Sequence, residues 1–370
     1  MRFFRPVTIT AAALIAATAA ISGCSSSGSS SAASGGSTSS SGQLTSINVI
    51  EAGSTPGRLP FYAALYGGVF QKYGLKVNLL EAQSGSQAAQ LLAGGKVQYE
   101  LGQVVDGLNV AQAGDPIDAL ALLTDKYENT VVVGAKYKNQ VKNFSDLAGV
   151  PIGITGVGSG TWQLANFVGQ QGNIPTSKLD EVNVGTAAIT SGQSLISGRI
   201  GAQIATDPAD LKLVDSGAAY FLADPLDVNN GATKQYPGFL KLATEPYIYT
   251  WAFSTKSYVS AHQDTTQKFL DALQAGENLI YKNTPAQTAA LLGQNEELGP
   301  FGSTLLTQLV TRLRDTSKSL PTTLTIPQAN YANTVAFASQ LKSSYASATY
   351  SSVVDNDFAD KAAQSVGTGS

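Results

Sequence analysis

Very few residues of this sequence have the types and spacing that enzyme or metal chemistry requires. The 370 residues include a single cysteine, Cys24, and a single histidine, His262. Catalysis by a Ser-His or Cys-His arrangement needs a histidine at the site, and His262 falls at the predicted start of a long helix. Zinc sites need three or four nitrogen, sulfur or carboxylate ligands. We therefore predict no catalytic residue, no metal site and no cofactor, and so no enzyme.

Two pairs of acids stand close together in the sequence, Asp224 with Asp227 and Glu296 with Glu297. Neighbouring carboxylates act as general acid and base when their surroundings separate their pKa values. Both pairs fall in predicted loops, where we expect solvated charges. The sequence therefore predicts no acid/base site at either pair.

Cys24 follows a segment with the features of an export signal. Residues 1–5 carry two arginines and no acid, and residues 7–21 are mostly apolar. This apolar run has about 15 residues, fewer than the roughly 20 that a membrane-spanning helix needs. Residues 21–24, Ile-Ser-Gly-Cys, resemble the bacterial lipobox, in which the chain is cut before the cysteine and the thiol is lipidated. We predict that residues 1–23 are a lipoprotein signal peptide and that Cys24 is the lipid anchor; the alternative is a free thiol near a secretory cleavage site.

The composition limits what the rest of the chain can bind. Residues 24–45 are predicted to be a flexible linker because they are dominated by Ser and Gly. Charged residues make up 13% of the chain and the net charge is −3, so no basic surface is expected to attract nucleic acid. A single cysteine allows no intramolecular disulfide, and the fold must therefore depend on its core. We expect a monomer at the cell membrane, facing the extracytoplasmic side.

Short apolar runs alternate with helical patterns along the body of the chain. Strands are predicted at residues 47–50, 75–80, 97–101, 119–123, 150–154, 181–184, 202–205 and 247–254. Helices are predicted at residues 59–70, 87–93, 161–170, 190–197, 265–281, 285–292, 303–312 and 327–343. This alternation is typical of parallel βαβ units and indicates an α/β fold with a helical C-terminal tail.

Several segments of the sequence resemble one family, the nitrate, sulfonate and taurine (NMT1/THI5-like) substrate-binding proteins of ABC importers. The resemblance lies in residues 59–64, 67–77, 91–97, 144–153 and 246–260. It runs from about residue 47 to about residue 294. The chain departs from the family at Gln98 and Gly201, where the family usually has an aspartate.

The resemblance implies a type II periplasmic binding protein fold, with two lobes that each hold a mixed, mainly parallel sheet flanked by helices. Residues 46–134 and 251–370 would form lobe 1, and residues 135–250 would form lobe 2. The implied function is capture of a small solute and its delivery to a membrane permease. A sulfonate, taurine or nitrate-like anion is the expected ligand. A pyrimidine or aromatic solute, a sensor receptor, and an enzyme like the fungal pyrimidine synthase of this fold stay open as alternatives.

The expected ligand site follows from a general rule: α/β sheets bind ligands at the carboxyl ends of their strands, beside helix N-termini. The glycine-rich loop at residues 156–162 is the strongest candidate, because Trp162 could stack on a ligand; the alternative is an ordinary turn with Trp162 in the core. Arg58 could clamp an anion with its guanidinium fork, or be a solvated loop residue. The predicted ligand-binding residues are Arg58, Leu59, Phe61, Ser84, Gly85, Ser86, Val104, Asp106, Gly158, Ser159, Gly160, Thr161, Trp162, Thr186, Asp207 and Trp251.

Overall fold

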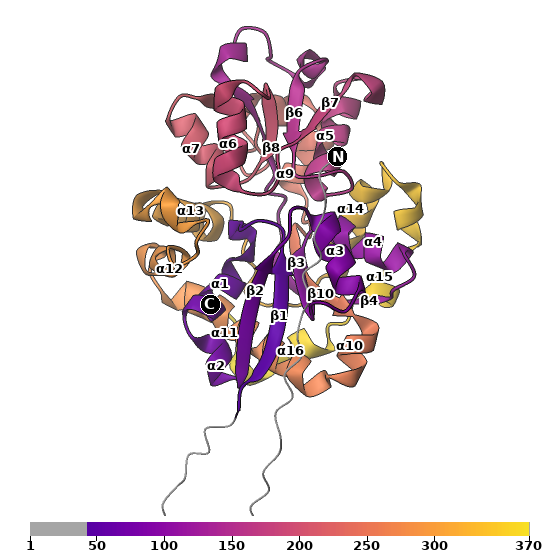
Figure 1. The fold of residues 1–370 in the computed structure, drawn as a ribbon, viewed down its shortest axis with the longest axis vertical. Helices are drawn as coiled ribbons and strands as arrows, with labels where there is room; N and C mark the ends of the chain where they lie inside the picture. Colours follow the sequence, from indigo (N-terminus) through magenta and orange to yellow (C-terminus); the bar gives the residue numbers. More distant parts are fainter. Residues whose placement is uncertain (1–42, 370) are drawn as a thin grey trace, which may run out of the picture. The chain divides into compact units, whose positions relative to one another are not determined.

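The computed structural model describes residues 43–369, and all of these belong to one compact unit. The predicted signal peptide (1–23), the predicted lipidation site Cys24 and most of the predicted linker lie outside the described residues. The described part is built on two five-stranded sheets, each covered by helices (Figure 1).

The first sheet has the strand order β2-β1-β3-β10-β4. β1 pairs in parallel with β2 and β3, whereas β10 is antiparallel to both β3 and β4. The sheet is therefore mixed, with β10 running against the other strands. Its strands are β1 (Thr45–Glu51), β2 (Leu75–Glu81), β3 (Tyr99–Gly102), β4 (Ile117–Thr124) and β10 (Thr250–Thr255).

The second sheet repeats this plan with the order β7-β6-β8-β5-β9. β6 pairs in parallel with β7 and β8, and β5 is antiparallel to β8 and β9. Its strands are β5 (Thr130–Gly134), β6 (Pro151–Ile154), β7 (Asp180–Asn183), β8 (Ala202–Ala205) and β9 (Ala219–Ala223).

The chain passes between the sheets twice, before β5 and before β10. Strand β5 pairs in the second sheet, so a lobe boundary drawn by strand pairing falls before Thr130 and not after residue 134 as predicted. The second passage returns the chain to the first sheet at β10, which begins at Thr250. We refer below to each sheet with its covering helices as the first and second lobe.

Helices of the first lobe come from both ends of the chain, because its fifth strand, β10, is supplied late. They are α1 (Leu59–Tyr66), α2 (Val69–Lys72), α3 (Gly85–Ala93), α4 (Val104–Gln112), α10 (Lys256–Ala261), α11 (Gln263–Lys282), α12 (Pro285–Leu292), α13 (Ser303–Thr311), α14 (Gln328–Ser339), α15 (Tyr350–Val353) and α16 (Asp357–Val366). Short 3-10 or π turns accompany them at Pro56–Arg58, Gly299–Phe301, Arg312–Thr316 and Ser343–Ser347.

Helices of the second lobe follow its strands in sequence. They are α5 (Gly160–Gln171), α6 (Ala188–Ser197), α7 (Ala209–Asp215), α8 (Gly231–Gln235) and α9 (Pro237–Thr244), with 3-10 turns at Ala135–Tyr137, Phe144–Leu147 and Thr176–Lys178. In Figure 1, α6 and α7 lie beside the second sheet, while α1 and α11 lie beside the first.

Alternating side chains of one strand supply the cores on the two faces of its sheet. In β5, Val131 and Val133 join one buried cluster and Val132 joins another. In β1, Val49 and Ile50 divide in the same way between two clusters. This is the two-residue period of a strand that is covered on both faces. Both sheets are thus central layers between helices, as the predicted fold class requires.

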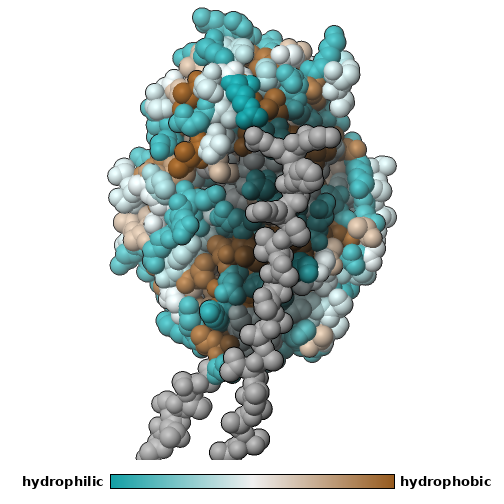
Figure 2. Space-filling model, viewed as in Figure 1, coloured by the Kyte–Doolittle hydropathy of each residue, from teal (hydrophilic) through white to brown (hydrophobic). Residues whose placement is uncertain are grey.

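The outer surface is mixed in character. On the face drawn in Figure 2, hydrophilic and hydrophobic residues are interspersed. Among the described residues, none of the helices combines the length and the apolar character needed to cross a bilayer.

Candidate functional site

A cavity of about 80 Å³ lies between the two sheets and is lined from both. Residues at the carboxyl ends of β1, β3, β6 and β8 border it, which is where parallel strands place their ligand-binding loops. The lining residues are Ala52, Ser54, Thr55, Arg58, Gly85, Gln103, Asp106, Asn129, Thr155, Ser159, Gly160, Thr161, Val184, Gly185, Thr186, Ser191, Gln203, Ile204, Ala205, Thr206, Asp207, Ala209, Tyr249 and Thr250.

Two helices begin at the cavity with a serine cap followed by a glycine. Ser84 Oγ accepts a hydrogen bond from the amide of Gln87 at 3.2 Å, and Ser159 Oγ accepts one from the amide of Trp162 at 3.4 Å. These bonds satisfy amides that are free at a helix N-terminus. The first helical residues, Gly85 in α3 and Gly160 in α5, both line the cavity.

Polar side chains of the first lobe lie close against the backbone at both glycines, so a larger residue there would displace them. A Cβ on Gly85 would lie 2.3 Å from Oδ1 of Asp106, and a Cβ on Gly160 would lie 1.7 Å from Oε1 of Gln103. The second of these contacts joins the two lobes. The glycines thus let acceptor groups of the first lobe approach both helix starts closely.

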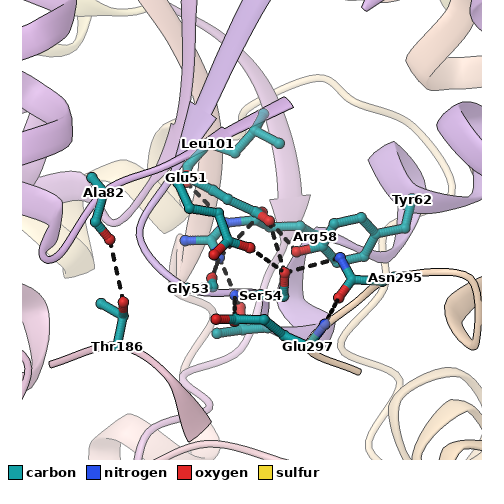
Figure 3. Close-up of polar contacts among 12 residues, drawn as sticks. Glu51, Gly53, Ser54, Arg58, Tyr62, Ala82, Leu101, Thr186, Asn295 and Glu297 are labelled. Carbon is teal, nitrogen blue, oxygen red and sulfur yellow. Dashed lines mark hydrogen bonds and ion pairs between the residues drawn. The ribbon is translucent and has the colours of Figure 1, made fainter. Parts of the chain in front are cut away.

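Arg58 is buried in a polar cluster of the first lobe, with 5% of its surface exposed (Figure 3). Its Nε donates to the carbonyl of Leu101 at 2.9 Å, and its Nη1 lies 3.5 Å from Oε2 of Glu51 and donates to the carbonyl of Gly53. The alternative of a solvated loop residue was therefore wrong. The guanidinium lines the cavity, but Glu51 already matches its charge.

Glu51 is held by other donors besides Arg58. Tyr62 donates its hydroxyl to Oε2 of Glu51 at 2.6 Å, and Ser54 donates to Oε1 at 3.0 Å. Ser54 in turn accepts from Asn295 at 2.9 Å, as Figure 3 shows. Burial raises the pKa of Glu51 to about 7 although Arg58 and these hydrogen bonds act in the opposite direction.

Asp106 and Glu100 bring two more carboxylates to the same side of the cavity. Oδ2 of Asp106 accepts from the amide of Gln103 at 2.9 Å and caps α4, while Oδ1 is buried without a hydrogen-bond partner. Both carboxylate oxygens of Glu100 are buried and lack a partner. Burial raises the pKa of Asp106 to about 7, and burial together with Asp106 raises that of Glu100 well above its ordinary value.

Arg312 joins the lobes on the other side of the cavity. It follows α13 of the first lobe, and its Nη2 lies 2.5 Å from Oδ2 of Asp224 while its Nη1 lies 3.5 Å from Oδ1 of Asp207. Asp224 is 3% exposed, so the prediction of a solvated loop charge was wrong for this residue. Burial and the neighbouring Asp210 raise the pKa of Asp207, and Arg312 opposes this shift.

Direct hydrogen bonds join the lobes at the rim of the cavity. Thr186 Oγ1 donates to the carbonyl of Ala82 at 3.2 Å, a contact drawn in Figure 3. Ser86 Oγ donates to the carbonyl of Val157 at 3.3 Å. Asn109 Nδ2 donates to the carbonyl of Gly158, also at 3.3 Å. The lobes are therefore in contact around the cavity, which is consistent with its small volume.

The structure brings half of the predicted site residues to the cavity: Arg58, Gly85, Asp106, Ser159, Gly160, Thr161, Thr186 and Asp207. Ser84, Ser86 and Gly158 lie next to these in sequence but do not line it. Five others belong to the buried cores or pack against them, because they are apolar positions of a strand or of helices that cover a sheet. These are Leu59, Phe61, Val104, Trp162 and Trp251.

The two tryptophans show this most directly. Trp251 is fully buried in the first lobe. Trp162 packs against the core of the second lobe, and its indole N–H donates to Oε2 of Glu181 at 3.0 Å. Neither lines the cavity, so the idea that Trp162 stacks on a ligand there is not supported by its position.

Several lining residues were missed from the sequence because they lie on the passages between sheets or inside a strand. Asn129 accepts from Nε2 of Gln103 at 3.1 Å just before β5, and Tyr249 and Thr250 lie at the start of β10. Gln203 lies within β8. For the first three, the available signal was that they lie near the predicted lobe boundaries at residues 134 and 250. Gln203 lies inside a short strand, and the sequence pattern gives no sign that it lines a site.

His262 lies away from the cavity. Its ring is exposed, stacks on Tyr258 with centroids 4.2 Å apart, and places Nδ1 3.0 Å from the Tyr258 carbonyl. Within residues 43–369, no three His, Cys, Asp or Glu side chains gather as ligands for a metal ion.

Curated relatives match only part of this chain. The 4-amino-5-hydroxymethyl-2-methylpyrimidine phosphate synthase of Saccharomyces cerevisiae is 30% identical over 102 residues, which cover 28% of this chain and 30% of the relative. The synthase of Aspergillus parasiticus is 31% identical over 103 residues, again 30% of its length. The match thus spans less than a third of these relatives.

Solved structures match nearly the whole folded part. A protein of Bordetella bronchiseptica superposes with a TM-score of 0.73 at 22% identity, covering 87% of this chain and 98% of that one. The nitrate-binding protein NrtA of Synechocystis gives 0.64 at 13% identity, with coverages of 88% and 89%. The alkanesulfonate-binding protein SsuA of Xanthomonas axonopodis pv. citri, bound to MOPS, gives 0.61 at 15% identity, with coverages of 81% and 93%.

These likenesses confirm the predicted fold, that of the periplasmic binding proteins. The family described as NMT1/THI5 like matches residues 55–287, which is more than half of the chain. The site geometry agrees, since its cavity lies between two lobes at the carboxyl ends of the strands. The chain belongs to the NMT1/THI5-like family, as the resemblance predicted.

Proposed function

We propose that this protein is the solute-binding component of an ABC importer, held at the extracytoplasmic face of the cell membrane by a lipid on Cys24. It would capture a small solute between its lobes and deliver it to the permease. The observation that carries this proposal is the cavity lined from both sheets, because a ligand held there contacts two bodies joined by only two passages of chain.

The size of the cavity supports a small solute. Its volume of about 80 Å³ is well below the roughly 300–1,000 Å³ of pockets that hold drug-sized ligands. Nitrate and an alkanesulfonate are the ligands named for two proteins of similar fold. Among the expected ligands for this chain, such small polar solutes fit better than a large aromatic one, since neither tryptophan lines the cavity.

A ligand screen by thermal unfolding tests the proposal. We expect at least one small polar solute to raise the melting temperature of the purified protein, and to be recovered unchanged afterwards. Asn129→Ala should weaken its binding about two- to tenfold, since it removes a cavity group that accepts from Gln103. The matched control is Asn229→Ala on the exposed surface. A broad screen without any stabilising solute would contradict the proposal.

An enzyme related to the pyrimidine phosphate synthases is the second candidate, favoured only by the partial sequence match. It would need His262, which is exposed and outside the cavity. We expect no product from the purified protein and no effect of His262→Ala on ligand binding. Product formation that this substitution abolishes would reverse the choice.

A further inference from the structure

We infer that the cavity binds a small organic cation, an ammonium or amidinium that donates hydrogen bonds, and not an anion. The inference rests on the proposed function, since it names the ligand class for the same site. It reverses the ligand charge that the family resemblance suggested. Four observations carry it: the unpaired atoms at the cavity, the charges of its arginines, the acids behind its wall, and the state of its helix N-termini.

The unpaired polar atoms at the cavity are acceptors. Oδ1 of Asp106 from the first lobe and Oδ2 of Asp207 from the second are buried without a hydrogen-bond partner, and both residues line the cavity. Oε1 of Gln203 is also buried without a hydrogen-bond partner. Among the described residues that line the cavity, the buried side-chain atoms without a hydrogen bond are all acceptors of this kind. A ligand with N–H donors would satisfy them.

The cations near the cavity are already paired. Arg58 lies against Glu51, and its Nε and Nη1 are used by backbone carbonyls of the first lobe. Arg312 lies against both Asp207 and Asp224. A positive charge that is not already neutralised would favour a buried anion. Neither guanidinium offers one.

More acids than cations stand behind the cavity wall. Glu128 is buried, with Oε1 accepting from Ser319 at 3.2 Å, and Asp210 accepts from Thr130 at 2.7 Å. Glu100 is buried without any partner on the Asp106 side. Charges in a desolvated site act more strongly on one another than in water. A cation bound here would favour the ionised forms of Glu100 and Glu128, whose pKa values burial raises in the ligand-free protein, whereas an anion would not.

At the N-termini of α3 and α5, groups of the protein already lie where an anion would bind. The serine caps at Ser84 and Ser159 already accept from amides of α3 and α5. Asp106 reaches the start of α3, where its carboxylate lies against Gly85. A carboxylate of the protein thus occupies the place that a bound anion would take at this helix.

Two matched pairs of ions test the charge directly. Guanidinium and nitrate are both planar and trigonal, and acetamidinium and acetate have the same heavy-atom shape with opposite charge. Each ion would be titrated against the purified protein at constant ionic strength, with binding followed by calorimetry and thermal unfolding. We expect acetamidinium or guanidinium to bind at least tenfold more tightly than its anionic counterpart.

Substitution of the cavity aspartates tests whether the cation binds beside them. Asp106→Asn keeps the acceptor that caps α4 and removes the charge, and it should weaken cation binding at least tenfold. Asp207→Asn provides a second variant from the other lobe. Asp115→Asn, an exposed acid just after α4, is the matched control.

The outcomes separate this inference from the proposed function. Tighter binding of nitrate or acetate, or absence of binding by all four ions, overturns the cation inference. The proposed function survives either result if the wider solute screen finds a ligand. Cation binding that Asp106→Asn leaves unchanged also overturns the inference, because the charge would then lie elsewhere.

Discussion

At the scale of single residues, Arg58 is the side chain whose role changed most between sequence and structure. Its guanidinium was predicted to bind an anionic ligand through two N–H donors. In the structure it is instead paired with Glu51 and donates to backbone carbonyls. Sequence reasoning could find that Arg58 stands at the site but not what it pairs with. Its partner, Glu51, is the last residue of β1, and only the fold places it beside the guanidinium.

The buried ion pair of Arg58 and Glu51 is expected to contribute to the stability of the fold. Arg58→Ala should lower the free energy of unfolding by about 3–5 kcal/mol, because it leaves the carboxylate of Glu51 buried without its counter-charge. Urea denaturation would measure the change. The double substitution Glu51→Gln with Arg58→Met should recover part of the loss. Arg199→Ala, on the exposed surface, is the control, and an equal loss there would contradict the argument.

At the scale of elements, a close backbone contact in the first lobe joins α1 to α11. Gly276, near the middle of α11, lies so close to α1 that a Cβ would be 2.3 Å from the carbonyl oxygen of Pro60. That oxygen belongs to the backbone of α1 and cannot turn away as a side chain can. Glycine is therefore needed in α11 despite its poor helix propensity.

This contact predicts a specific packing defect. Gly276→Ala should destabilise the protein by about 1–3 kcal/mol, since the two helices must separate to admit the methyl group. Gly231→Ala, at the start of α8, is the matched control because a Cβ there meets open space. Equal unfolding midpoints in urea for the two variants would show that α1 and α11 separate without cost.

The elements also show what the sequence could and could not predict. Alternating apolar runs identified eight of the strands, since each pattern is local. Strands β5 and β9 were missed: β5 is a short run of valines on a passage between the sheets, and β9 follows a turn without clear alternation. Which side chains of α1 and α5 face the cavity depends on how each helix packs on its sheet. For that reason the sequence identified loops that border the cavity, but it wrongly placed the side chains of Trp162 and Phe61 in the ligand site.

At the scale of the whole molecule, buried acids connect stability to pH. Burial raises the pKa of Glu51 and of Asp106 to about 7 and that of Glu128 to about 8. In the unfolded chain these groups titrate near pH 4. Between about pH 4 and about pH 8 the folded protein holds more protons than the unfolded chain. The free energy of unfolding therefore falls as the pH rises through this range.

We therefore expect the melting temperature of the ligand-free protein to fall from about pH 5 to about pH 8. Unfolding at several pH values in one buffer system of constant ionic strength measures this. Asp106→Asn should flatten part of the fall, because it removes one of the raised carboxyls. A melting temperature that rises through this range would contradict the assignment of these acids as buried and protonated.

Arg312 links both lobes, so its removal tests whether the ion pairs hold them together. Arg312→Gln should leave Asp207 and Asp224 without their counter-charge and favour separation of the lobes. X-ray scattering should then report a larger radius of gyration than for the unsubstituted protein. Arg314→Gln, whose partner Asp315 is adjacent in sequence and partly exposed, is the control.

The late position of β10 in the chain sets an order of assembly. β10 pairs with β3 through Trp251 and Gly102, so the first sheet joins segments from both sides of the second lobe. The second sheet needs only Thr130–Ala223. Sheet pairings between distant segments are slow because a long loop must close first. During synthesis from the N-terminus, the second lobe can therefore form before β10 is available to pair with β3 and β4. Pulsed hydrogen exchange during refolding should protect the amides of β6 and β8 before those of β3 and β10.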